Sequence, residues 1–166
     1  MDKSVLATVV RFWLVLFFQI FVFKGMGENI GGVDVYIYPV FIMLLPLSTP
    51  LAFVLLLSFA YGLAIDAFYD SNGLHAASLT LVGFERFFLG SSKLRRRYEV
   101  YRTPSRRRLQ FRRFISHSVK IMGIHSFAVI TLEELSFSSV WVLRFLLTFS
   151  LSLMFVVLYY FIFNRT

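Results

Sequence analysis

The sequence predicts an all-α integral membrane protein that forms a single membrane domain over residues 1–166. Hydrophobic residues make up 58% of the chain and the mean hydropathy is +0.73. A soluble domain of this size needs far more polar surface. Six apolar segments alternate with short polar links, and one link holds nearly all of the excess positive charge. These observations predict six transmembrane helices with both termini in the cytoplasm.

The predicted spans vary in length and in their proline content. The second contains Pro39 and Pro46, so we expect it to be kinked or tilted. Pro50 suits the first turn of the third helix. Arg11 interrupts the first apolar run and no small-residue cleavage site follows Phe23, so we expect a retained span rather than a secretory signal. The six spans cover about 4–23, 34–48, 50–69, 73–91, 115–135 and 139–163.

A basic loop over 92–114 predicts the orientation of the chain. From Lys93 to Arg113 there are ten basic residues and one acidic residue, Glu99, which gives ten minus one, or +9, against +8 for the whole chain. Basic loops remain in the cytoplasm. The loops expected on the other side carry no Lys or Arg, and their acidic residues are Glu28, Asp70, Glu133 and Glu134.

The arginines of this loop are candidates for binding anionic lipid head groups or an acidic cytoplasmic partner. Arginine runs also neutralise nucleic-acid phosphates. A basic run directly after a membrane helix is more typical of a topology determinant, with lipid attraction of about 1 kcal/mol per basic residue. We therefore expect no nucleic-acid partner. The candidate residues are Arg95, Arg96, Arg97, Arg106, Arg107 and Arg108.

A polar group interrupts the apolar sequence between the third and fourth spans. Asp66 and Asp70 are four residues apart and share a helix face. His75 stands one turn into the next helix and faces back across the hairpin. Two carboxylates and one histidine without a fourth ligand are a weak metal signal. The sequence therefore favours a structural hairpin with a polar lip over a metal site.

Small and capping residues in the same stretch support this hairpin. Gly62 should allow the two helices to approach closely. Gly73 lies in the turn, where Ser71 or Asn72 is expected to cap the fourth helix by accepting its free N–H groups. In the inner part of that helix, Arg86 is expected to extend toward the cytoplasm.

Charged residues near the turn between the last two spans allow two interpretations. Glu133 or Glu134 is expected to pair with Arg144 across this turn. They could instead act with His125 in an intramembrane hydrolase, but the spacing lacks the H-E-x-x-H pattern. The chain has no cysteine, which excludes thiol catalysis and disulfides. We expect a non-enzymatic protein without a cofactor.

Several motifs resemble the MreD family of rod shape-determining proteins. They are G-L-x-x-D at 62–66, G-L-H-A at 73–76, V-G-F-E-R-F-F-L at 82–89, P-S-x-R-x-L-x-F at 104–111 and L-E-x-x-S-F at 132–137. Most family members have proline where this chain has Phe87. The resemblance extends over nearly the whole chain and is densest over 55–90.

The resemblance implies a multi-pass protein of the bacterial inner membrane that serves the cell-elongation (rod) complex and so controls cell shape. It implies a fold like the small six-helix substrate-binding components of vitamin transporters. MreC is the expected direct partner, with MreB, RodA and a class B penicillin-binding protein in the wider complex. The hairpin would then bind partners or serve as a structural element, through Gly62, Asp66, Asp70, Gly73 and His75. The alternative is a small-molecule-binding or transport component, with a pocket that includes Asp66 and His75.

Overall fold

The computed structural model of the chain describes residues 3–29, 32–46, 49–89, 107–135 and 137–163, and within these ranges it contains helices and no strand. A first long helical stretch consists of α1 (Lys3–Phe18), the wide π-turn η1 (Gln19–Phe23) and α2 (Lys24–Asn29). The remaining helices are α3 (Pro39–Met43), α4 (Leu51–Tyr69), α5 (Leu74–Leu89), α7 (Arg107–Glu134) and α8 (Ser139–Phe163).

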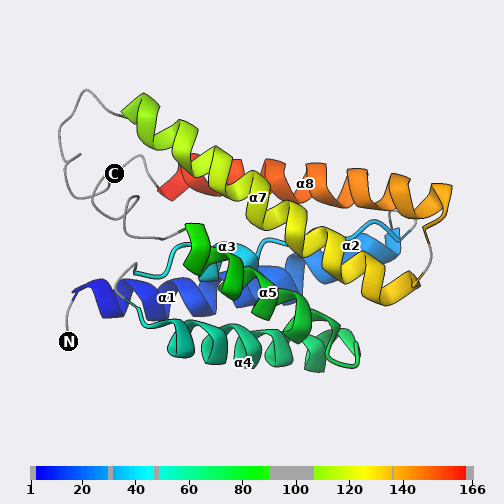
Figure 1. Cartoon of the computed structure of the whole chain (residues 1–166), viewed down its shortest axis with the longest axis horizontal. Helices are drawn as coiled ribbons and strands as arrows, with labels where there is room; N and C mark the ends of the chain where they lie inside the picture. The colour runs from blue at the N-terminus through cyan, green and yellow to red at the C-terminus, as the bar shows by residue number, and fades with distance from the viewer. Residues whose placement is uncertain (1–2, 30–31, 47–48, 90–106, 136, 164–166) are drawn as a thin grey trace.

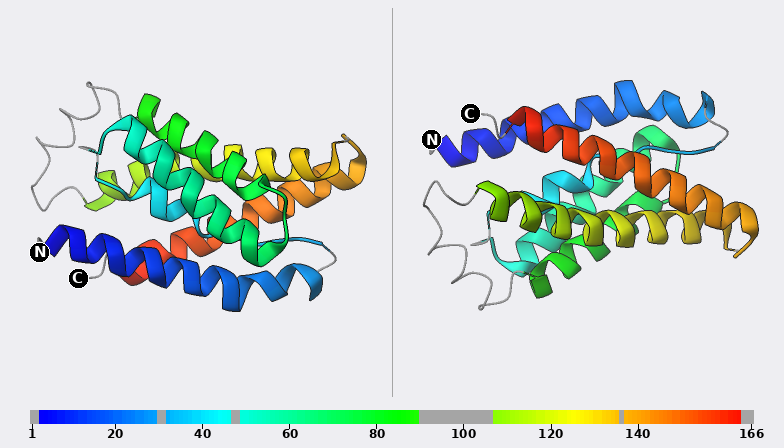
Figure 2. Two further views of the ribbon diagram at one scale, coloured as in Figure 1. Left: turned by 90° about the horizontal axis from the view of Figure 1, so that it is seen from below. Right: turned by 90° about the horizontal axis from the view of Figure 1, so that it is seen from above.

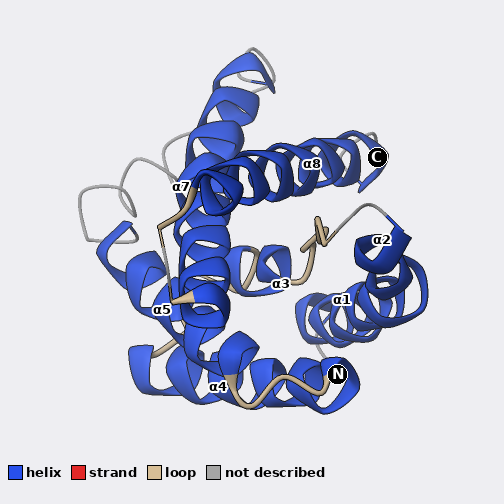
Figure 3. Ribbon diagram, turned by 90° about the vertical axis from the view of Figure 1, so that its right-hand side faces the viewer, coloured by secondary structure: helices blue, strands red, loops and turns tan. Residues whose placement is uncertain are grey.

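The long helices run lengthwise beside one another (Figure 1). Short turns join α4 to α5 and α7 to α8 at one end of the bundle, and α1 begins and α8 ends at the opposite end (Figures 1 and 2). Seen along the bundle, the long helices surround the short helix α3 (Figure 3). The centre of the protein is therefore formed by a segment that is not itself a long helix.

Four helices are long and apolar enough to cross a membrane, counting only the described part of the chain. They cover Thr8–Met26, Leu51–Tyr69, Phe114–Glu134 and Ser139–Ile162. Large apolar side chains project outward from them, such as Trp13, which is 63% exposed, and Phe21, which is 71% exposed. Such surfaces suit lipid rather than water. The chain thus has the pattern of a multi-pass membrane protein.

The segment 34–48, expected as the second span, does not form one helix. Residues 33–37 have no regular secondary structure and run as an extended stretch (Figure 2), and α3 covers only Pro39–Met43. Proline lacks the N–H that an interior helical position needs and fits the first helical turn, so the helix starts at Pro39. The β-branched residues Val33, Val35 and Ile37 favour the extended form before it. High hydropathy here reflects burial, since Val35 and Ile42 are fully buried.

Two predicted boundaries also differ from the structure. The first helical stretch continues to Asn29, beyond the expected end at residue 23. The basic loop was expected to last to residue 114, but α7 begins at Arg107, because its first turns contain Arg, Leu and Gln, which favour helix. Arg107 and Arg108 thus belong to a helix. The other predicted lipid-contact arginines, Arg95, Arg96, Arg97 and Arg106, lie outside the described residues.

Candidate functional site

Side chains from two helices hold the extended segment at the centre of the bundle. Gln19, the first residue of η1, is fully buried. Its Nε2 donates to the carbonyl of Val35 at 3.0 Å, and its Oε1 accepts the N–H of Ile37 at 2.9 Å. Ser152 of α8 accepts the N–H of Tyr36 at 2.9 Å. Extended backbone without these partners would leave polar groups unpaired in an apolar interior, which is costly.

Tyr38 follows the extended segment and joins two buried histidines. Its hydroxyl lies 2.7 Å from Nδ1 of His75 on α5 and 2.5 Å from Nε2 of His125 on α7. The side chains of Tyr38 and His125 are fully buried and His75 is 3% exposed. A hydroxyl has a single proton, so Tyr38 donates to one ring nitrogen and accepts an N–H from the other. The rings of Tyr36 and Tyr69 pack edge-on against His75 at 5.5 and 4.9 Å between centroids.

Asp66 on α4 caps the start of α5 from the neighbouring helix. Its Oδ1 accepts the N–H of His75 at 2.9 Å and the hydroxyl of Ser71 at 2.7 Å. Its Oδ2 accepts the N–H of Ala76 at 2.9 Å. The expectation that Ser71 or Asn72 caps this helix was wrong, because the turn directs Ser71 to the Asp66 carboxylate instead. A carboxylate at a helix N-terminus also interacts favourably with the helix dipole.

The buried polar side chains described above form a polar centre, which consists of Gln19, Tyr36, Tyr38, Asp66, His75, His125 and Ser152. The other two predicted hairpin residues belong to the turn rather than to this polar centre. Asp70 is exposed and has a left-handed backbone with φ of +50°. Gly73 has φ of +87°, which glycine adopts at little cost. The structure thus brings together Gly62, Asp66 and His75, and leaves Asp70 at the surface.

The cap makes a specific prediction for Asp66. We expect Asp66→Asn to reduce stability by about 1–2 kcal/mol, because an amide NH₂ replaces one of the acceptor oxygens that face N–H and O–H donors. Asp70→Asn is the matched control and should change stability by less than about 0.5 kcal/mol, since asparagine tolerates the left-handed backbone. Thermal unfolding of both variants in the same detergent would test this. Equal effects of the two substitutions would contradict the cap.

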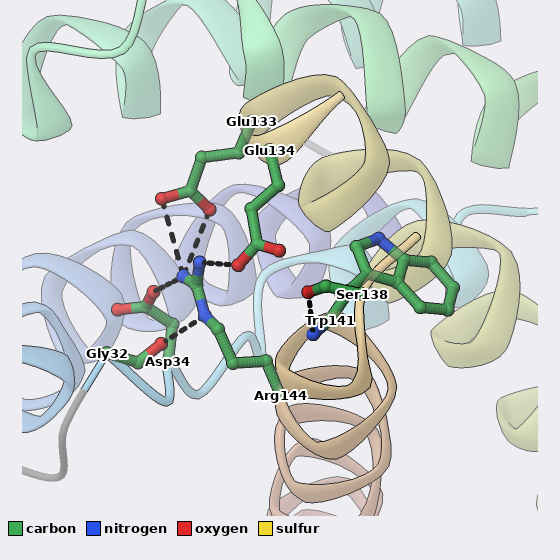
Figure 4. A network of polar contacts seen from close by, with 7 residues as sticks. All are labelled: Gly32, Asp34, Glu133, Glu134, Ser138, Trp141 and Arg144. Atoms are coloured by element: carbon green, nitrogen blue, oxygen red, sulfur yellow. Dashed lines mark hydrogen bonds and ion pairs between the residues drawn. The ribbon is translucent and has the colours of Figure 1, made fainter. Parts of the chain in front are cut away.

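Arg144 on α8 binds both glutamates at the turn end of the bundle (Figure 4). Its Nη1 lies 2.5 Å from Glu134 and its Nη2 3.1 Å from Glu133. Its Nε donates to the carbonyl of Gly32 at 2.8 Å, and the carboxylate of Asp34 lies 3.9 Å away. Asp34 is therefore the most distant of the three acidic partners of Arg144. The network joins the α7–α8 turn to the start of the extended segment.

Arg86 on α5 does not extend toward the surface, contrary to the prediction. It is 5% exposed, and its Nη2 donates to the carbonyls of Leu45 at 2.5 Å and Pro46 at 2.9 Å. The helix α3 ends at Met43, before these carbonyls, and the Pro46 carbonyl also accepts the N–H of Thr49 at 3.1 Å. Arg86 therefore holds the C-terminal end of the central segment (residues 33–46), and Gln19 holds its N-terminal part. The adjacent Glu85 has one buried oxygen, Oε2, without a hydrogen-bond partner among the described residues.

The residues of the hydrolase interpretation are held by different partners. His125 contacts Tyr38, whereas Glu133 and Glu134 contact Arg144. His125 and Glu133 are eight residues apart on one helix, about 12 Å along its axis. Among the residues that the structure describes, no three of the types His, Asp, Glu and Cys are grouped to hold a metal ion.

Several residues of this polar centre were not singled out from the sequence. Gln19 had a usable signal, because an uncharged polar side chain inside an apolar span needs a partner within the protein. Tyr36, Tyr38 and Ser152 had none, since tyrosine and serine are common in membrane helices.

Comparisons of the chain with protein-family models, with curated proteins and with solved structures find no match.

Proposed function

We propose that this chain is a non-enzymatic scaffold of the bacterial cell-elongation complex, located in the inner membrane. In this proposal the central segment counts with five long helical stretches as six membrane segments, and both termini are cytoplasmic. The observation that carries the proposal is that residues of the MreD-like motifs make the contacts between the helices. Gly62, Asp66 and His75 all serve to fix α4, α5 and the central segment to one another.

A bundle whose polar groups are bonded internally suits a scaffold. The buried polar side chains described above mostly bond to each other or to backbone. What remains available to other molecules is apolar helix surface, together with the charged groups at the two ends. Association of helices in lipid relies on close packing and a few polar contacts. A single-span partner such as MreC could bind in this way, and MreB, RodA and the class B penicillin-binding protein would join the wider complex.

Purification of the tagged chain from its native host in mild detergent, followed by mass spectrometry, tests this proposal. We expect an MreC-like protein and a class B transpeptidase to copurify. An unrelated tagged multi-pass protein from the same membrane, purified in parallel, controls for nonspecific recovery. Recovery of an ATPase pair, with no wall-synthesis protein, would contradict the scaffold.

A second candidate function is a small-molecule-binding component with the same arrangement of helices. The observation that favours it is the polar centre, where Tyr38, His75 and His125 meet beside non-helical backbone. Transporters bind substrates near the bilayer midplane, at helices whose backbone is interrupted. A small molecule recovered in stoichiometric amount from the wild type, and lost from Tyr38→Phe, would support this function in place of the scaffold.

A further inference from the structure

Arg11 is a charged residue inside a membrane-spanning helix, and its contacts leave most of its guanidinium unused. Its Nε donates to the hydroxyl of Tyr159 on α8 at 3.1 Å. Within the described residues every ion pair belongs to Arg144, so Arg11 has no carboxylate partner there. An unpaired cation in a membrane span is costly and usually has a functional reason.

Arg11 and Tyr159 lie at the same depth in the bundle. Arg11 is three residues from the start of the apolar window Thr8–Met26, and Tyr159 is three residues from the end of the window Ser139–Ile162. With a rise of 1.5 Å per residue, each lies about 4.5 Å inside the end of its helix window. Both ends are on the side where α1 begins and α8 ends (Figure 2). This depth is that of the boundary between acyl chains and head groups.

The hydrogen bond to Tyr159 orients the guanidinium instead of leaving it to extend freely. With Nε fixed between α1 and α8, the two terminal amino groups form a fork that matches two oxygens of a phosphate. Arg112 on α7 is exposed at the same end of the bundle. It follows Phe111, whose ring packs on that of Tyr160 at 5.4 Å. A second positive charge thus lies near the end of α8.

We propose that Arg11 and Tyr159 form a binding site for the phosphate of an anionic glycerophospholipid in the leaflet at this end of the bundle. Arg11 contacts the phosphate directly, and Tyr159 is a positioning residue that holds the guanidinium at the level of the head groups. The exposed Leu6 and Leu158 offer apolar surface to the acyl chains. This site is separate from the central polar cluster and does not depend on the scaffold proposal.

Native mass spectrometry of the intact chain with phosphatidylglycerol tests the site. We expect Arg11→Gln to weaken binding on the order of thirtyfold, because charge-assisted hydrogen bonds to phosphate are lost. Arg112→Gln removes the same charge at the same end and should weaken binding by no more than about fivefold. Tyr159→Phe keeps the charge and nearly the same volume, and should weaken binding about fivefold, because the guanidinium loses the hydrogen bond that orients it.

The arms of the experiment separate this site from simpler explanations. Equal losses in Arg11→Gln and Arg112→Gln, or unchanged binding in Tyr159→Phe, would reduce the effect to diffuse charge and overturn the proposal. Equal retention of phosphatidylcholine would overturn the preference for an anionic lipid. Displacement of phosphatidylglycerol by excess inorganic phosphate would mean that the site binds free phosphate rather than lipid. If Arg11→Gln fails to fold, Tyr159→Phe decides alone.

Discussion

Replacing Gly62 by alanine should separate α4 from α5 and remove most of the folded protein. A Cβ at this position would lie 2.7 Å from both the N–H nitrogen of Ala76 and the carbonyl oxygen of His75, and closer still to the Ala76 Cα. These are backbone atoms at the start of α5, so no side chain can rotate away to make room. We expect a loss of about 3 kcal/mol, the upper part of the range for overpacking.

Two other glycines provide graded controls for this result. In Gly83→Ala the new Cβ would meet the Ser58 hydroxyl at 2.5 Å, and that side chain can rotate, so the cost should be smaller. At Gly25 a Cβ would meet nothing within 4 Å, so Gly25→Ala should have a melting temperature close to that of wild type or slightly higher. Melting in detergent, with size-exclusion profiles, measures all three. A Gly62→Ala protein that melts like Gly25→Ala would show that the two helices do not approach this closely.

The long helices of the hairpins could be predicted well from the sequence. α8 was expected over 139–163 and is found at Ser139–Phe163, and α4 was expected over 50–69 and is found at Leu51–Tyr69. Each is a continuous apolar run bounded by residues that end helices, such as Pro50 and the left-handed Asp70. The pairing of Arg144 with Glu133 or Glu134 was also accessible, because the turn between these helices is short, and the structure shows that both glutamates bind Arg144.

The central segment could not be predicted because hydropathy measures burial and not backbone conformation. A buried extended strand and a buried helix are equally apolar. What permits the extended form is the set of distant groups that bond its backbone. Gln19 is 16 residues from Val35, and Ser152 is 116 residues from Tyr36.

The same reason limits the prediction of the polar centre. The hydroxyl of Tyr38 reaches His75 and His125, which are 37 and 87 residues away along the chain. His75 could be singled out because a turn motif precedes it. Tyr38 could not, since nothing local distinguishes it from the other tyrosines. Sequence reasoning therefore identified the helices of the site but not the residue that connects them.

Replacing Gln19 by leucine should release the central segment, with a cost of about 3–5 kcal/mol. Leucine has a similar volume but leaves the carbonyl of Val35 and the N–H of Ile37 unpaired in the apolar interior. Each such buried group costs about 1–3 kcal/mol in an apolar interior. The substitution also removes a 2.7 Å bond between Gln19 Nε2 and the Tyr69 hydroxyl, which adds to the loss.

Ser152 gives the matched comparison for this prediction. Ser152→Ala removes one bond to the same segment, at the N–H of Tyr36, and should cost about 1–2 kcal/mol. Ser150→Ala, two residues away on the exposed face of α8, should have almost no effect. Hydrogen exchange should report the same order locally, with fast exchange at the amide of Ile37 in Gln19→Leu and at that of Tyr36 in Ser152→Ala. If these amides stay protected and Gln19→Leu melts like wild type, the side chain of Gln19 does not hold the segment in place.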